Sequence, residues 1–166
     1  KKVKQRAMIS PFVDPVWLIN KRTMHLPKGQ SDVRFHYKTD LTNLTGGGTI
    51  TLYGAAMHMH NLGKSGSMSV TKKDGTKKCL LNIPRWDFNW QSTFLLKKPV
   101  VLKRGDTMRM ECRWDNSAQN QPVVNGVRRK PQDVYWGSGS YDEMCLSFLY
   151  ITCKDPDGDP SDCFEF

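Results

Sequence analysis

Two of the four histidines of this chain stand two positions apart, at His58 and His60. The surrounding segment, residues 49–60, begins with β-branched and aromatic side chains, a composition that predicts a strand. Side chains two apart on a strand point to the same face, so both imidazoles would reach one place. Such a pair can supply two nitrogen ligands to a metal ion. Taken alone, the pattern fits two unrelated surface histidines equally well.

A metal ion held by this pair would need a further ligand from elsewhere in the chain. The sequence contains eight methionines, and we expect most of them to fill the core, the usual role of this side chain. A thioether combined with imidazoles favours copper in its lower oxidation state over zinc, calcium or magnesium. Composition and spacing do not single out one methionine as the ligand.

Three segments of the sequence together resemble one known family. His58-Met59-His60-Asn61-Leu62-Gly63-Lys64 is similar to the H-x-H-x-x-G-[KR] segment of the copper type II, ascorbate-dependent monooxygenases, which include peptidylglycine α-hydroxylating monooxygenase and dopamine β-monooxygenase. Asp142-Glu143-Met144-Cys145 resembles the [DE]-E-M-C segment of these enzymes. Between the two, the turn at residues 102–106 and the later Glu111-Cys112 resemble the family's Gly-Asp turn and the cysteine that follows it. The order and spacing of these segments agree with those of the family over residues 24–153.

The resemblance implies that His58, His60 and Met144 bind the copper ion at which oxygen and substrate react. It also implies a disulfide between Cys112 and Cys145 and a β-sandwich that is the second of two such domains. The first domain of these enzymes binds an electron-transferring copper ion through three histidines, two of them adjacent. This sequence contains no adjacent pair. We therefore expect it to be the oxygen- and substrate-binding part of a larger enzyme that hydroxylates a C–H bond, with ascorbate as reductant.

Three positions near the expected site depart from the peptide-amidating members of the family, which have Arg, Asn and Tyr there to hold a peptide's terminal carboxylate. The corresponding residues here are Ala56, Leu146 and Phe148, and none of them can form a bidentate clamp on a carboxylate. We therefore expect a small, less polar organic substrate and place these three residues in its pocket.

Aromatic side chains are candidates for the rest of the pocket, although most aromatic residues of a folded domain serve the core or brace loops. We select Trp136 and Tyr141, because the Gly- and Ser-rich segment 137–140 brings this loop directly to Met144. Further aromatic residues that could contribute are Trp86, Phe88, Trp90 and Tyr135.

The elements that must position these residues are predicted to be strands. Strand-like segments cover residues 94–102, 107–114 and 143–153, and residues 67–81 form a hairpin around the turn-favouring Asp74-Gly75 pair. No segment holds a helical period of about 3.6 residues. We expect an all-β fold, an antiparallel, jelly-roll-like β-sandwich of about eight or nine strands. One domain is expected over residues 1–153, followed by an acidic, turn-rich tail over residues 154–166.

Five cysteines without a Cys-x-x-Cys motif favour an oxidising compartment, so we expect a secreted or luminal protein. Cys153 and Cys163 bracket a Pro- and Asp-rich loop that they could close as a second disulfide. Cys79 would then be the odd thiol, which we expect to be buried and inert. Residues 155–159 have an oxygen-rich spacing that could attract calcium, but they match no complete calcium loop.

The net charge of +9 raises the question of a polyanionic partner such as nucleic acid. The basic residues are scattered along the sequence and no groove-reading motif accompanies them, so we expect no nucleic-acid binding. No apolar run reaches the length of about 18 residues that a membrane span requires. The expected partners are an N-terminal electron-transfer copper domain, molecular oxygen and the organic substrate. The basic groups are Lys1-Lys2, Lys72-Lys73, Lys77-Lys78, Lys97-Lys98 and Arg128-Arg129-Lys130.

Two other functions remain open for the same sequence. A stand-alone secreted copper-binding module would bind copper through the same residues without catalysis. A purely structural sandwich would bind no copper, and changes at the histidines would alter only its stability. Catalysis in contrast requires ascorbate-dependent hydroxylation by the two-domain protein.

Overall fold

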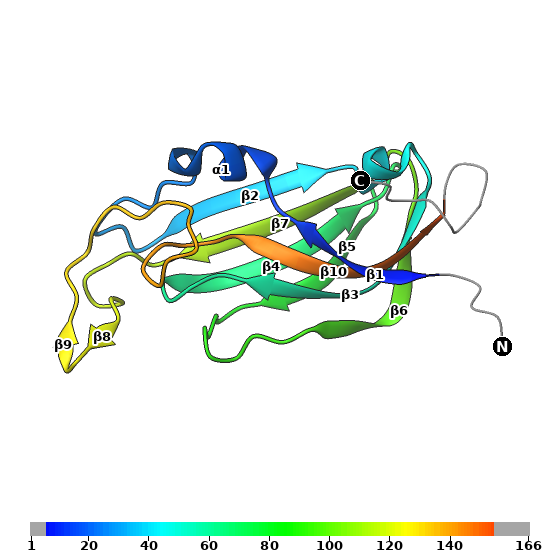
Figure 1. The fold of residues 1–166 in the computed structure, drawn as a ribbon. Coiled ribbons are helices and arrows are strands. Elements are labelled where there is room, and N and C mark those ends of the chain that lie inside the picture. The colour runs from blue at the N-terminus through cyan, green and yellow to red at the C-terminus, as the bar shows by residue number, and fades with distance from the viewer. Residues whose placement is uncertain (1–5, 155–166) are drawn as a thin grey trace.

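A computed structural model describes residues 6–154, and they form two facing β-sheets (Figure 1). One sheet has the strand order β1-β10-β3-β6 and the other the order β2-β7-β4-β5. All neighbouring strands are antiparallel. The predicted all-β, jelly-roll-like sandwich is therefore confirmed. The strands are β1 Ala7–Phe12, β2 Val33–Thr39, β3 Thr49–His58, β4 Gly63–Thr71, β5 Lys77–Ile83, β6 Phe94–Leu102, β7 Thr107–Trp114 and β10 Leu146–Lys154.

A small hairpin stands apart from the two sheets. It consists of β8 (Val123–Val124) and β9 (Val127–Arg128), and it lies in the long connection between β7 and β10. The remaining regular elements are the α-helix α1 (Pro15–Ile19) and two short 3-10 helices, η1 (Lys21–Thr23) and η2 (Leu41–Thr45). Within residues 6–154, no helix is long and apolar enough to cross a membrane.

The predicted strands agree with the structure to within a few residues. β6 and β7 coincide with the predicted segments 94–102 and 107–114. The predicted hairpin is formed by β4 and β5, with Gly75 at its turn in the left-handed conformation (φ 86°). The strand predicted from residue 143 begins at Leu146.

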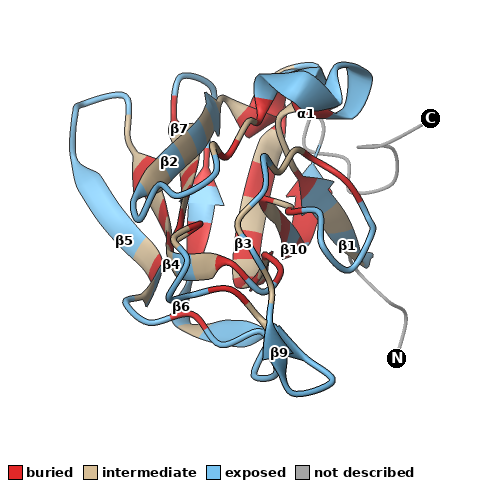
Figure 2. Cartoon of the chain, turned by 90° about the vertical axis from the view of Figure 1, so that its left-hand side faces the viewer, coloured by how far each residue is buried: buried red, intermediate tan, exposed pale blue. Residues whose placement is uncertain are grey.

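Buried and more exposed residues alternate along the facing strands, as the burial colours show (Figure 2), and the buried ones form the hydrophobic core. On β7 every second residue from Met108 to Trp114 is fully buried, as expected for a strand with one face toward the core. Methionine provides much of this core, in agreement with the role expected for most of these residues. The buried methionines are Met24, Met57, Met59, Met68, Met108 and Met110.

A disulfide joins Cys112 of β7 to Cys145, the residue before β10, with an S–S distance of 2.14 Å. Because β7 and β10 belong to different sheets, the bond connects the two layers. The pairing expected from the family resemblance is thus confirmed. Cys153 is buried on β10, but its expected partner Cys163, the calcium-like segment 155–159 and the tail after residue 154 lie outside the described residues.

Cys79 is a free cysteine, and its side chain is exposed. The expectation of a buried thiol is therefore wrong. Cys79 lies on β5, an edge strand whose first three residues, next to the hairpin turn, are all exposed. The local sequence does not reveal whether a strand will be central or at an edge.

The disulfide closes a loop of 33 residues and should contribute to stability mainly by restricting the unfolded chain. We predict that the double substitution Cys112→Ala/Cys145→Ala lowers the free energy of unfolding by about 2–4 kcal/mol. Chemical denaturation under non-reducing conditions measures this change. Cys79→Ala is the matched control and should have almost no effect. Equal stability of the double variant and the wild type would contradict the prediction.

Candidate metal centre

His58 is the last residue of β3, and His60 lies two residues beyond it. The strand is thus shorter than predicted, but the two imidazoles still meet. Their ring centroids are 5.1 Å apart, with an interplanar angle of 79°. His60 is only 7% exposed, whereas His58 is partly buried. Met57 and Met59, which alternate with the histidines along the chain, are buried in the core, as expected for most of the methionines.

Met144 lies beside this histidine pair. In the antiparallel pairing of β3 and β10, Leu146 stands opposite His58. Met144 lies two residues before Leu146, and His60 lies two residues after His58, so both follow directly on this paired end of the strands. Hydrogen bonds of the preceding two residues to His60 support this placement: the Asp142 carbonyl oxygen lies 2.8 Å from its Nδ1, and a Glu143 carboxylate oxygen accepts from its backbone N–H at 2.8 Å. The structure therefore brings the three predicted ligands to one end of the sandwich.

The Nδ1 atoms of both histidines face carbonyl oxygens, which only accept hydrogen bonds. His60 Nδ1 meets the Asp142 carbonyl, and His58 Nδ1 lies 2.6 Å from Oε1 of Gln91. The orientation of the Gln91 amide is set by its own Nε2, which donates to the Phe88 carbonyl at 2.8 Å. Both Nδ1 atoms must therefore carry the proton. This leaves each Nε2 lone pair free, which is the tautomer that a metal ligand requires.

The chemistry of the donor set fits copper. In the described part of the chain, no group of three His, Cys, Asp or Glu side chains could hold a metal ion. The Met144 thioether is a ligand of another type that lies next to the hydrogen-bonding partners of His60. Two imidazoles and a thioether form a soft set that suits copper in its lower oxidation state.

The buried carboxylate of Glu143 holds the two ligand-bearing segments together. It accepts hydrogen bonds from the backbone N–H groups of His60 (2.8 Å) and Leu62 (2.7 Å) and from Trp114 Nε1 (2.9 Å). Its burial raises the pKa of Glu143 to about 7, although these N–H donors act in the opposite direction. The sequence shows Glu143 as a conspicuous neighbour of Met144, but gives no sign of this role.

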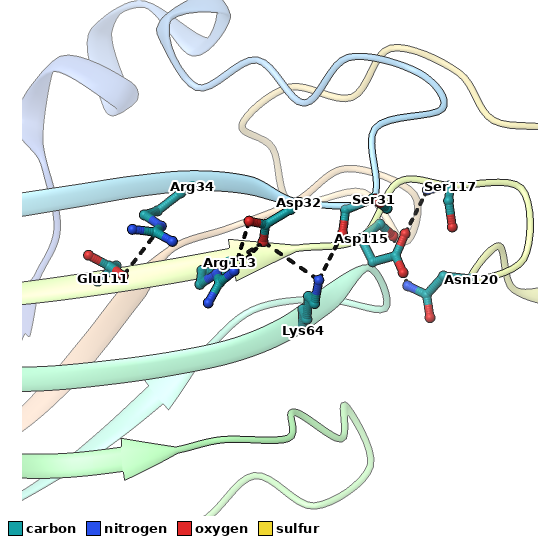
Figure 3. Close-up of polar contacts among 9 residues, drawn as sticks. All are labelled: Ser31, Asp32, Arg34, Lys64, Glu111, Arg113, Asp115, Ser117 and Asn120. Carbon is teal, nitrogen blue, oxygen red and sulfur yellow. Dashed lines mark hydrogen bonds and ion pairs between the residues drawn. The ribbon is translucent and has the colours of Figure 1, made fainter.

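Gly63 and Lys64, which belong to the motif around the histidines, support the site from outside. A Cβ atom on Gly63 would overlap the Trp86 ring, whose Nε1 donates to the His60 carbonyl at 3.1 Å. Lys64 points away from the histidines, across the outer face of the other sheet. There its ammonium donates to the Ser31 carbonyl at 3.0 Å and lies 3.6 Å from Asp32 (Figure 3). Both motif residues therefore have structural explanations.

Three of the five predicted pocket residues flank His58 on the outer face of the sheet. Leu146 stands opposite His58, and Phe148 stands opposite Ala56. Phe148 is 43% exposed, while the other two are partly buried. Together they form an apolar surface that leads up to the first histidine.

The other two predicted pocket residues differ from each other. Tyr141 is exposed, with the Arg129 guanidinium 3.3 Å from its ring centroid. Trp136 is only 6% exposed and packs against Trp17 at 5.9 Å between ring centroids. Trp136 therefore serves the core, and its closeness to Met144 in sequence does not make it a wall of an open pocket.

Gln91 is a member of the site that the sequence does not predict, whereas Phe88 is among the further aromatic candidates. The Phe88 ring centroid lies 6.0 Å from that of His60. Both residues belong to the segment between β5 and β6, whose irregular sequence gives no indication that it folds over the histidines. A cavity of about 160 Å³ nearby is lined by Asn61 and residues 140–143, but by neither histidine nor Met144.

The sequence matches the copper type II ascorbate-dependent monooxygenase family, C-terminal domain, over residues 16–165. The chain belongs to this family. It is also similar to the human putative DBH-like monooxygenase protein 2, with 28% identity over 102 residues. This match covers 61% of the chain but 18% of the relative, so the chain spans less than a fifth of that protein's length. The family is copper- and ascorbate-dependent, in agreement with the donor set at the end of β3.

The hydrogen bond from Gln91 should determine the tautomer of His58. We predict that Gln91→Ala converts His58 of the metal-free protein from the Nδ1–H form to a mixture of tautomers, because the only acceptor at Nδ1 is lost. Nitrogen-15 NMR of the imidazole measures this directly. Gln91→Glu keeps an acceptor oxygen and should preserve the Nδ1–H form. An unchanged His58 spectrum in Gln91→Ala would contradict the prediction.

The raised pKa of Glu143 makes stability depend on pH. Between its ordinary value of 4.5 and about 7, the folded protein binds more protons at this group than the unfolded chain, so the group's contribution to stability falls as pH rises. Burial lowers the pKa of His58, which acts in the opposite direction. The informative quantity is therefore the difference between wild type and Glu143→Gln.

In the wild type, titration of Glu143 should lower the free energy of unfolding by on the order of 2–3 kcal/mol between pH 4.5 and pH 7. We predict that metal-free Glu143→Gln does not show this decrease. At every pH the variant should also be less stable, because its NH₂ group faces N–H donors. Denaturation at a series of pH values measures both effects. Parallel pH profiles for the two proteins would show that Glu143 does not titrate in this range.

Proposed function

We propose that His58, His60 and Met144 bind one copper ion, and that this domain is the oxygen- and substrate-binding part of a monooxygenase. The observation that carries the proposal is the pair of Nδ1 hydrogen bonds to carbonyl oxygens, which leave two neighbouring Nε2 atoms available beside Met144. When bound, copper would supply the redox chemistry and an open coordination position for oxygen. The protein's own contribution is to fix the ligands and to shape the substrate surface.

The surface next to His58 favours a substrate that presents an apolar group. Ala56, Leu146 and Phe148 offer no hydrogen-bond donor that could hold a carboxylate. Beyond the histidines, Phe88 and the 80% exposed Trp90 add aromatic surface from the segment between β5 and β6. A small organic molecule with an alkyl or aryl part would bury that part here, with its C–H bond near the metal. Hydroxylation of this C–H bond is the reaction that we assign to the site.

Catalysis of this kind needs an electron donor, for which we propose a companion copper domain with ascorbate as the external reductant. The matching family is described as ascorbate-dependent and as a C-terminal domain. The match covers only 18% of the human relative, so that protein is long enough to contain further domains. The buried Cys112–Cys145 disulfide favours an oxidising compartment, so we also propose that the protein is secreted or resides in the secretory lumen.

We predict that His58→Ala lowers the affinity for copper(I) at least roughly 100-fold. Loss of a direct ligand should weaken metal binding more than loss of a residue that only hydrogen-bonds to a ligand, which typically lowers the affinity 10–100-fold. Competition titration with a copper(I) chelator measures the affinity. His36→Ala, on β2 of the other sheet, is the matched control and should bind copper like the wild type. Equal affinity of wild type and His58→Ala would rule out the assigned site.

Catalysis is tested on the longest natural form of the protein, supplied with copper, ascorbate, oxygen and a panel of aryl and alkyl substrates. Substrate-dependent oxygen consumption supports the monooxygenase. Met144→His should retain copper, since imidazole is also a ligand, but lose most of the turnover because the soft thioether is absent. Tight copper binding without any turnover would instead favour a copper-binding module.

A further inference from the structure

The fold gathers basic residues that are scattered in the sequence. The turn between β4 and β5 contacts the turn between β6 and β7: a Cβ atom on Gly105 would lie 3.2 Å from Cδ of Lys73. A hydrogen bond joins the same turns, because the backbone N–H of Lys73 donates to the Asp106 carboxylate at 2.9 Å. The Lys72-Lys73 pair therefore lies beside Lys103 and Arg104.

Asp106 and Asp40, two acidic residues at this end, are turned toward the protein itself, whereas Asp74 is exposed and accepts from the Thr76 N–H at 2.8 Å. Asp106 is buried and accepts hydrogen bonds from the Lys72 ammonium and from the backbone N–H groups of Lys73 and Lys103. Asp40 accepts from the Gly105 N–H at 2.7 Å and from Thr42. These carboxylates are occupied in joining the turns. They leave most of the neighbouring cations without an acidic partner.

Two edge strands extend the positive surface. β5 and β6 are the edge strands of the two sheets, and they lie on the same side of the sandwich because β1 packs on β2 and β3 packs on β4. We name seven exposed cations the basic edge; none forms an ion pair with any residue from 6 to 154. They are Lys73, Lys77, Lys78, Lys97, Lys98, Lys103 and Arg104.

We propose that the basic edge binds a sulfated polysaccharide. A row of cations without ion pairs among residues 6–154 attracts a linear polyanion through ion pairing and the release of its counterions. The Cys112–Cys145 disulfide favours an oxidising compartment, where sulfated polysaccharides rather than nucleic acids are the linear polyanions available. The proposal is independent of the copper site.

The location of the basic edge leaves the metal centre accessible. β3 starts at this end of the sandwich and finishes at His58, so the turn residues of the basic edge lie roughly 30 Å from that histidine along the strand. Lys97 and Lys98 lie nearer, beside the middle of β3, because β6 pairs Val100 with Leu52 and Leu95 with Gly54. A polysaccharide held at the turn end would leave the histidines uncovered. The edge would localise the protein on a matrix or cell surface while its site stays open to small molecules.

Lysines on edge strands also prevent edge-to-edge pairing between sheets. This explanation covers the lysines of β5 and β6. It does not cover Lys73, Lys103 and Arg104, which lie in turns. The test therefore includes a turn residue.

The experiment measures binding of a size-defined heparin oligosaccharide to the whole chain at several salt concentrations. We expect Lys77→Gln/Lys78→Gln/Arg104→Gln to weaken binding roughly ten-fold or more and to reduce the slope of log affinity against log salt by about two to three. The matched control is Lys21→Gln/Arg22→Gln/Lys130→Gln, which removes the same charge outside the basic edge and should bind like the wild type. All six side chains are exposed, and circular dichroism confirms folding.

Three results would overturn the proposal. Equal losses in both triple variants would show that net charge alone attracts the polyanion. Undiminished binding by the basic-edge variant would place the contact elsewhere. Equal affinity for desulfated heparin, or for a DNA duplex of the same length, would show that the surface does not select a sulfated polysaccharide.

Discussion

The carboxylate of Glu143 is buried between the two sheets, and the geometry of the candidate site depends on its hydrogen bonds. One oxygen accepts from the His60 N–H and from the Trp114 indole, and the other accepts from the Leu62 N–H. These bonds fix the turn after β3 against the segment before β10. Removal of a buried acceptor would leave several N–H groups without a partner, which is more damaging than the loss of a surface contact. The neighbouring disulfide at Cys145 restrains the same segment covalently.

A rigid frame of this kind suits a metal ligand that lies outside regular structure. His60 and Met144 both lie just beyond the ends of their strands, where backbone hydrogen bonding of the sheet no longer holds them. Glu143 replaces those missing ladder bonds on one side. On the other side, the Trp86 indole donates to the His60 carbonyl, and it can approach because Gly63 has no side chain. The glycine of the motif is thus explained by packing around the ligands rather than by contact with a metal.

The sequence allowed prediction of those features that depend on local pattern. The spacing of His58 and His60, the strands around them and the turn at Gly75 are local, and each is found close to its predicted place. Features that depend on the order of the strands in the sheets cannot be predicted from the sequence in this way. Cys79 is exposed because β5 is an edge strand, and Gln91 reaches His58 from 33 residues away. Neither relation leaves a periodic or compositional signal.

The basic residues show the same difference between features set by the local sequence and features set by the order of the strands. Each basic doublet, considered along the chain, resembles an ordinary solvated turn or strand end. The antiparallel order of the strands brings the turns after β4 and β6 together, and Asp106 and Asp40 bind their backbones. Because the carboxylates are used for this purpose, they neutralise little of the nearby lysine charge. The acids that stabilise this end of the sandwich are therefore also the reason that its surface is strongly positive.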